Sequence, residues 1–167
     1  MNNMKNLNQY IQDKFELNKN TKIYYNYHPK TVDELRDILE ERLKEDKNAD
    51  LNDIDISGLT TLKYLNSRAY IFGLFEYLDP HDINISHWDV SNITDMYQLF
   101  VDCRNFTGKG LENWNVSNVE NMVSMFAGCK NLKTDLNDWN VNKNTATDGM
   151  FWHSSLQNNP PKWYKYK

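Results

Sequence analysis

Apolar and polar positions repeat with a fixed period through the second half of the chain. Three copies begin at Trp88, Trp114 and Trp139, and they read WDVSNITDMYQLFVDC, WNVSNVENMVSMFAGC and WNVNKNTATDGMFWHS. The copies start 26 and then 25 residues apart. A repeat of this length indicates stacked units, in which each unit buries its apolar face only against its neighbours.

Within each copy, the spacing of apolar residues changes from about 2 to about 3.6. Trp88 and Val90 alternate with the polar Asp89, as on a half-exposed strand. Four apolar residues then stand at i, i+3, i+4 and i+7, as on one face of a helix; in the first strong copy they are Met96, Leu99, Phe100 and Cys103. The pattern predicts one strand and one helix in each unit.

Two copies are weaker than the others. A degenerate copy opens at Leu51, and its residues 54–62 align with residues 88–96 of the first strong copy, but Ile54 stands where the later copies have Trp. In the last copy, Asn144, Thr147 and Ser154 replace core residues, as a terminal unit requires because nothing stacks on its far side. We therefore expect a degenerate opening unit, two strong units and a polar closing unit that completes the array.

The first fifty residues follow a different pattern. It predicts an amphipathic helix near residues 4–17 and a short extended segment at residues 22–28. The sequence Thr31-Val32-Asp33-Glu34 has the spacing of a capping box and begins a longer helix. Its apolar stripe consists of Val32, Leu35, Ile38, Leu39 and Leu43. Residues 64–78 are predicted as the helix of the opening unit plus an insertion.

Together these elements predict an α/β fold. We expect a short leucine-rich-repeat-like solenoid, with one strand and one helix per unit of about 25 residues and a small helical cap at its N-terminus. The cap region would span residues 1–50, and the repeat solenoid with its C-terminal cap would span residues 51–167.

Composition narrows the classes of function. The chain of 167 residues has a formal net charge of -4, which disfavours binding by phosphate neutralisation; nucleic acid is expected only through a nucleoprotein target. The first residues lack the apolar core of a signal peptide, and no run reaches the roughly 18 apolar residues that span a bilayer. We expect a cytoplasmic protein that contacts no membrane, and we favour a monomer.

The two strong copies resemble the repeats of BspA-like leucine-rich repeat proteins. They also resemble the related repeat of unknown function first recognised in mycoplasma lipoproteins, with units of the form W-D/N-V-S-N-V/I-T-D-M-x-x-M-F-x-x-C. The resemblance covers residues 51 to about 155, and HPKTVDELRDILEERL is similar to the segment that often leads into such arrays. It implies a leucine-rich-repeat build and a role in adhesion and binding, and it carries over no catalytic residue. Such repeats are also similar to those of small proteins carried by phages and mobile elements.

Reactive side chains form no catalytic pattern in the sequence. There is no HExxH spacing, no nucleophile elbow and no phosphate loop, and Asp89 and Asp95 fall where loop and cap residues are expected. Cys103 and Cys129 hold the same place in consecutive copies, so buried neighbouring thiols are favoured, while a disulfide or a reactive site stays open. We predict no enzyme, no cofactor and no metal site.

Polar residues of the predicted strands form the candidate binding surface. They would make one exposed row across three units, consisting of Asp89, Ser91, Asn115, Ser117, Asn140 and Asn142. Tyr97 and Val123 would lie beside this row as outlying contacts. Trp163, Tyr164 and Lys165 belong to a basic, aromatic C-terminal cluster, which either packs back as a cap or contacts a partner.

The predicted function is non-catalytic binding of a protein partner whose working surface is occluded. The resemblance to phage-borne repeats implies an inhibitor of a host protein, for example a defence nuclease in the manner of an anti-CRISPR protein. One alternative is a bacterial cell-surface adhesin-type repeat protein, or a fragment of one, that binds host or matrix proteins. Another is a nucleic-acid-associated inhibitor that uses the C-terminal cluster.

Overall fold

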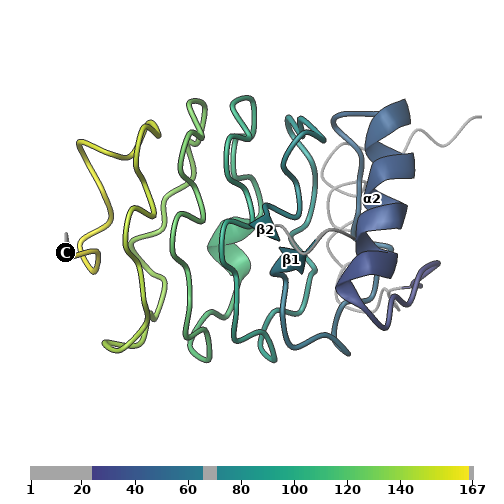
Figure 1. Ribbon diagram of the computed structural model, residues 1–167, viewed down its shortest axis with the longest axis horizontal. Coiled ribbons are helices and arrows are strands. Elements are labelled where there is room, and N and C mark those ends of the chain that lie inside the picture. The colour runs from purple at the N-terminus through teal and green to yellow at the C-terminus, as the bar shows by residue number, and fades with distance from the viewer. Residues whose placement is uncertain (1–23, 66–70, 166–167) are drawn as a thin grey trace, which may run out of the picture.

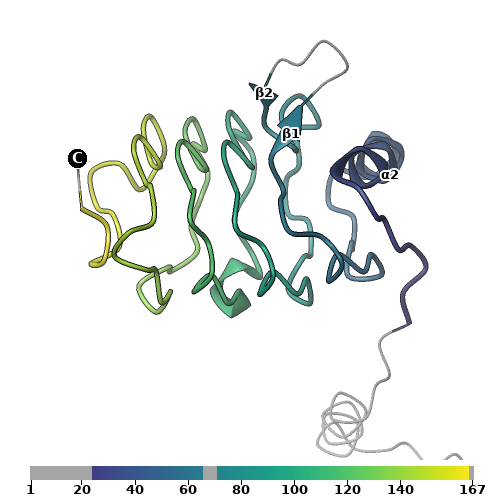
Figure 2. The same cartoon turned by 60° about the horizontal axis from the view of Figure 1, so that its bottom comes forward.

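The computed structural model describes residues 24–65 and 71–165. The chain runs through a row of turns that lie side by side, with α2 (Val32–Glu45) at one end and the C-terminus at the other (Figure 1). The other regular elements are β1 (Tyr64–Leu65), β2 (Ile71–Phe72) and the 3-10 helix η1 (Leu111–Asn113). β1 and β2 pair antiparallel, Tyr64 with Phe72 and Leu65 with Ile71, and they project from the row (Figure 2).

The predicted α/β fold, a leucine-rich-repeat-like solenoid with one strand and one helix per unit, is wrong. We number the repeated segments as unit 1 (residues 88–113), unit 2 (114–138) and unit 3 (139–165), after an opening unit (51–87). In the part of the chain that the structure describes, units 1 to 3 contain no α-helix and no strand beyond isolated one-residue bridges. The fold is mostly irregular, and its described α-helix lies before the repeats.

Backbone amides of each unit donate partly within the unit and partly to the next unit, which explains why the units form neither a helix nor a strand. The amide of Phe100 donates to the carbonyl of Met125 in unit 2 (2.9 Å), whereas the next amide, of Val101, donates to the carbonyl of Gln98 in its own unit (3.0 Å). Gln98 and Asp102 also have positive φ angles, 54° and 55°, which interrupt a right-handed helix. Alternate amides therefore close local turns or bind the neighbouring unit, and neither pattern is continuous.

The buried positions were predicted correctly even though the helix was not. The residues at i, i+3, i+4 and i+7 are at most 2% exposed in both strong copies: Met96, Leu99, Phe100 and Cys103, then Met122, Met125, Phe126 and Cys129. Phenylalanine rings stack through the row from Phe75 to Phe100, Phe126 and Phe151, with centroid distances of 4.9, 5.7 and 5.8 Å. This ladder is the centre of the apolar core.

Tryptophan side chains tie the units to earlier parts of the row. The indole Nε1 of each ring donates to a backbone carbonyl 27–37 residues earlier in the chain, in the pairs Trp88 to Leu51, Trp114 to Ile85, Trp139 to Leu111 and Trp163 to Leu136, at 2.6–3.1 Å. Ile54 replaces Trp in the opening unit and is 1% exposed. The indole is therefore both a core side chain and a hydrogen-bond donor between units.

The helix α2 begins as predicted, and it covers the opening unit. The hydroxyl of Thr31 accepts from the amide of Glu34 (3.2 Å), while the Glu34 carboxylate accepts from the amide of Lys30 (2.8 Å) in place of the Thr31 amide expected for a capping box. Leu35, Leu39 and Leu43 are fully buried in the common core.

Arg36 fastens α2 to the opening unit. It is 9% exposed, and its Nη1 donates to the carbonyls of Leu74 (2.6 Å) and Glu76 (3.1 Å), while its Nε donates to Glu40 (2.7 Å). The guanidinium also lies over the ring of Tyr64. A buried cation paired with backbone carbonyls was not predicted from the sequence.

Two local predictions differ from the structure. Residues 64–78 form β1, β2 and turns instead of a helix, since their hydrogen bonds follow the same divided pattern, and 66–70 lie outside the described residues. In unit 3 the buried residue is Thr145 (5% exposed), because its hydroxyl donates to the carbonyl of Val119 (2.7 Å), whereas Asn144 is exposed.

The predicted helix at 4–17 also falls outside the described residues, and Tyr27 of the extended segment pairs with Ile54.

Candidate functional site

The predicted polar row is a series of side-chain-capped turns, not a strand face. The Oδ1 of Asp89 accepts from the amide of Ser91 (3.0 Å), and the Oδ1 of Asn115 accepts from both the amide and the hydroxyl of Ser117 (3.3 and 2.8 Å). Asp89 and Asn115 are exposed, and the serines are half-buried. These side chains satisfy backbone donors of their own turn, so part of their polarity is structural.

The closing unit continues the row with a shift of register. Asn140 is exposed and, among the described residues, its side chain makes no hydrogen bond. Asn142 is also exposed, and its Oδ1 accepts from the amide of Asn144 (3.0 Å) as Asn115 does for Ser117 in unit 2. The turn therefore begins later in unit 3, which brings Asn144 to the surface.

Two asparagines outside the predicted site link the row together. The Nδ2 of Asn92 donates to the carbonyl of Ser57 (3.1 Å), and the Nδ2 of Asn118 donates to the carbonyl of Ser91 (2.7 Å). Each exposed amide is thus oriented by the preceding unit, and its Oδ1 is left for other donors. The signal in the sequence was the Ser-Asn dipeptide at the same place in consecutive copies.

A crevice of about 460 Å³ opens between units 2 and 3 along this row. Its walls are Ser117, Asn118, Val119, Glu120, Asn142, Asn144 and Thr145. Glu120 is exposed, and no hydrogen bond or ion pair of its carboxylate is recorded among the described residues. The crevice therefore combines fixed amide groups, hydroxyl groups and one free carboxylate, which together suit hydrogen bonding to a polar surface.

A second cavity, of about 300 Å³, lies on the other side of Asn142. It is lined by Val141, Asn142, Lys143, Thr145, Thr147, Trp163 and Lys165. The two cavities share Asn142 and Thr145, so the structure brings four predicted residues to one end of the row: Ser117, Asn142, Trp163 and Lys165. Asp89, Ser91, Asn115 and Asn140 line neither of these two cavities.

The C-terminal cluster packs back on the core. Trp163 stacks on Trp139 (6.3 Å between centroids), and Tyr164 meets the edge of Phe151 (5.0 Å). Trp163 and Tyr164 are half-buried, whereas Lys165 is exposed. The sequence left two roles open for this cluster, packing back as a cap or contacting a partner. Trp163 and Tyr164 pack back as a cap, and Lys165 alone of the three exposes its whole side chain.

The outlying residues Tyr97 and Val123 lie in the turn that follows the row. Their amides donate to Asp95 Oδ1 (2.9 Å) and Asn121 Oδ1 (3.1 Å), and both side chains are half-buried. The ammonium of Lys63 lies 5.6 Å from the centre of the Tyr97 ring. Neither residue lines the crevice.

An exposed tryptophan was missed by the sequence reasoning. Trp152 is 62% exposed and stacks on His153 at 4.7 Å, beyond the buried Phe151. An exposed tryptophan is a common anchor in protein interfaces. Its counterparts Val101 and Ala127 are aliphatic, so the aligned copies could have marked it as a departure from the pattern.

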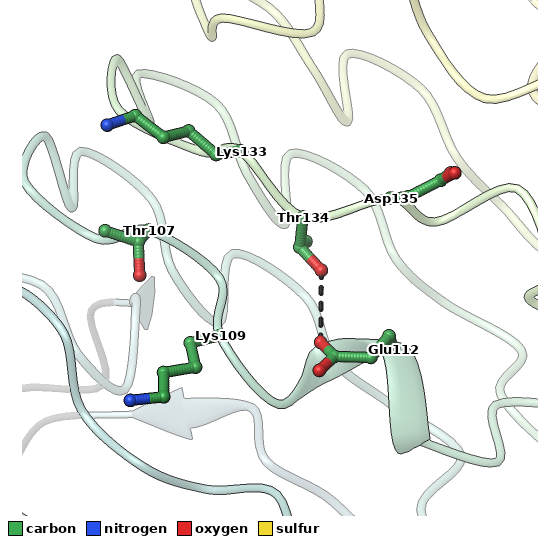
Figure 3. Close-up of a pocket in the computed structure, with 6 residues that line it drawn as sticks. All are labelled: Thr107, Lys109, Glu112, Lys133, Thr134 and Asp135. Carbon is green, nitrogen blue, oxygen red and sulfur yellow. Dashed lines mark hydrogen bonds between the residues drawn. The ribbon is translucent and has the colours of Figure 1, made fainter.

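A further cavity, of about 350 Å³, lies beside η1 and contains no predicted residue. In Figure 3, Lys109 and Lys133 extend to one side of it, and Glu112 and Asp135 lie on the other. Thr134 donates to Glu112 (3.2 Å), and two hydrogen bonds from Asn137 lower the pKa of Asp135. The cavity is therefore lined by both basic and acidic side chains, and Glu112 and Asp135 already accept hydrogen bonds from neighbouring residues.

The cysteines are buried neighbours, as the favoured prediction held. Both thiols are free, and they donate to the carbonyls of Phe75 (from Cys103, 3.6 Å) and Phe100 (from Cys129, 3.0 Å). Burial raises the pKa of each thiol well above its usual range. A neutral thiol is a poor nucleophile and a poor metal ligand.

The described residues contain neither a candidate metal site nor a candidate membrane-spanning helix. No group of three or more His, Cys, Asp or Glu side chains is placed to hold a metal ion in residues 24–65 and 71–165. Over the same ranges, no helix combines the length and the apolar character that crossing a bilayer requires. The cytoplasmic location and the monomeric state stay predictions.

Comparison with known proteins gives one match. A family model described as "Mycoplasma protein of unknown function, DUF285" matches residues 70–167, which is more than half of the chain. No curated protein and no solved structure matches.

Proposed function

The chain belongs to the family of mycoplasma proteins of unknown function DUF285, and on this premise we propose that it is a non-catalytic protein-binding molecule. The observation that carries the proposal is the crevice between units 2 and 3, with its oriented amide and hydroxyl groups. The finer likeness to BspA-like repeat proteins, which are associated with binding, agrees with this role and is part of the proposal.

The crevice is suited to binding because its polar groups are already positioned. Asn118 is held by the carbonyl of Ser91, and Asn142 is held by the amide of Asn144. Side chains that are ordered before binding lose less conformational entropy on association, so their hydrogen bonds contribute more to affinity. The same bonds direct the Asn118 Oδ1 outward as an acceptor.

Charge indicates the chemistry of the partner surface. Glu120 in the crevice and Asp89 further along the row are exposed acids, and the whole chain has a net charge of -4. We expect the partner to present arginine or lysine side chains together with amide donors. Such complementarity would raise the association rate mainly at low salt.

The mode of action would be occlusion of the partner's working surface. The more specific prediction, an inhibitor of a host protein such as a defence nuclease, rests on the resemblance of the repeats alone. It stays part of this proposal, as does the absence of catalysis.

The test compares two variants in capture from host lysate followed by calorimetry on the captured protein. Glu120→Lys/Asn144→Lys changes two exposed crevice side chains that hold no turn together, and the control Glu41→Lys makes the same charge reversal as Glu120→Lys on the exposed face of α2. We expect the double variant to bind about tenfold more weakly or worse, and Glu41→Lys to bind normally. Equal binding by both variants would refute the crevice as the binding surface.

A further inference from the structure

Within residues 24–65 and 71–165, the last unit leaves one edge of the hydrogen-bonded row unpaired. In the preceding units, the amides of Met96 and Met122 donate to the carbonyls of Asn121 and Ala146, both at 2.8 Å. The equivalent amide of Thr147 donates to no acceptor among the described residues, and the same holds for Gly149, the counterpart of Ser124.

An unpaired acceptor accompanies these donors. The carbonyls of Thr94 and Glu120 accept from the amides of Glu120 and Ala146 (2.8 and 2.9 Å), whereas the equivalent carbonyl of Thr145 accepts nothing in the described part of the chain. A parallel bridge consists of one such acceptor and one such donor flanking the paired residue. Thr145 and Thr147 therefore form half of a further bridge at Ala146, which would continue the series from Thr61 through Asp95 and Asn121.

The edge opens into the second cavity, and that cavity is basic. Thr145 and Thr147 line it together with Trp163, Lys143 and Lys165. Both lysines are exposed, and neither takes part in an ion pair among residues 24–65 and 71–165. The exposed Asp148 is the one acidic residue between positions 143 and 151.

We propose that this edge binds an extended acidic segment of another protein, which adds to the row as one more parallel bridge. Its backbone would accept from Thr147 and Gly149 and donate to Thr145, in the manner of strand addition to an open sheet edge. Its acidic side chains would face Lys143 and Lys165, and its intervening apolar side chains would contact Trp163.

The structure disfavours a second copy of the chain as the occupant. Head-to-tail stacking would need the opposite end of the row, and α2 covers that end with Leu35, Leu39 and Leu43 (Figure 1). The edge also differs from the crevice, which faces unit 2, although Asn142 and Thr145 border both cavities. The inference therefore goes beyond the proposed function and can fail independently of it.

The test uses a blocked peptide of about nine residues that alternates glutamate and valine, long enough to cover the edge. Nuclear magnetic resonance of the labelled full chain should show saturable binding, with slowed hydrogen exchange at the amides of Thr147 and Gly149. A peptide of alternating lysine and valine should bind at least about tenfold more weakly. Shifts confined to other residues, or no binding at millimolar peptide, would overturn the proposal.

Two sets of variants separate the edge from the fold and from the crevice. Thr147→Pro removes an amide that has no acceptor among the described residues, so it should abolish peptide binding without breaking a backbone hydrogen bond of that part of the chain. If that variant fails to fold, Lys143→Glu/Lys165→Glu gives the decisive result: binding should fall about tenfold, whereas the control Lys130→Glu should not change it. Unchanged peptide binding by the double lysine variant would refute the proposal. So would a doubled molecular mass in the absence of peptide, together with slow hydrogen exchange at the amides of Thr147 and Gly149, because a second copy would then occupy the edge. Normal peptide binding by Glu120→Lys/Asn144→Lys would keep the two sites distinct.

Discussion

Removal of one ring from the phenylalanine ladder should destabilise the whole row of units. Phe100 is fully buried, and its ring lies 4.9 Å from Phe75, 4.4 Å from Phe106 and 5.7 Å from Phe126. These neighbours come from the opening unit, from unit 1 itself and from unit 2. The variant Phe100→Ala therefore removes contacts on both sides of unit 1.

The expected cost follows from the size of the cavity that the missing ring leaves. Truncation of a buried phenylalanine to alanine costs about 3–5 kcal/mol, and the lost ring pairs favour the upper half of this range. For a chain of this length, about 2–4 °C of Tm is lost per kcal/mol. We therefore expect Tm to fall by about 8–20 °C.

The assay is thermal and urea unfolding followed by circular dichroism, with Trp152→Ala as the matched control. Trp152 is also aromatic and lies in the same series of turns, but it is 62% exposed, so its loss should cost less than about 0.5 kcal/mol. A cost below about 1 kcal/mol for Phe100→Ala, or equal costs for both variants, would refute the ladder as the centre of the core.

Three further predictions concern the junction with α2, the thiols and the dependence on pH. Arg36→Met should cost about 2–4 kcal/mol in urea unfolding, because two backbone carbonyls lose their buried donor, and it should speed hydrogen exchange in α2; unchanged exchange would contradict the role of Arg36. Cys103 and Cys129 should resist a thiol reagent in the native protein and react in urea, since burial keeps both thiols protonated; rapid native labelling would contradict this. The pKa of Asp55 is lowered, first by its hydrogen bond from the Ser57 hydroxyl, so its contribution to stability is present above the unfolded pKa of about 3.9 and is lost as pH falls through the lower folded value. The urea midpoint of Asp55→Asn should therefore fall less on acidification than that of the wild type, and an equal fall would contradict this assignment.

The sequence predicted which residues are buried better than it predicted the elements that bury them. A spacing of i, i+3, i+4 and i+7 places side chains on one face of a helix, but it also suits a pair of tight turns separated by left-handed residues. Gln98 and Asp102 adopt such left-handed conformations. Their residue types did not indicate this, since glycine, which favours positive φ, holds the equivalent places only in some copies. Backbone hydrogen bonds between units determine that these segments form turns and not helices, and the sequence of a single copy does not show such bonds.

The candidate site was predicted in part for the same reason. Four residues of the predicted row, Asp89, Asn115, Asn140 and Asn142, are exposed, whereas Ser91 and Ser117 are half-buried. Asp89 and Asn115 also cap their own turns, a role that an alternating pattern does not distinguish from a strand. The shift of register in unit 3 moved Asn144 outward and Thr145 inward, and the crevice depends on that shift.

Site-specific photo-crosslinking in host cells tests the proposed binding surface most directly. A photoreactive amino acid would replace Asn144 in the crevice or, as the control, Glu41 on α2, since both side chains are exposed. We predict one dominant crosslinked protein from position 144, lost when Glu120→Lys is added, and no such product from position 41. The same products from both positions, or a product from position 144 that survives Glu120→Lys, would contradict the claim that the crevice between units 2 and 3 binds the partner.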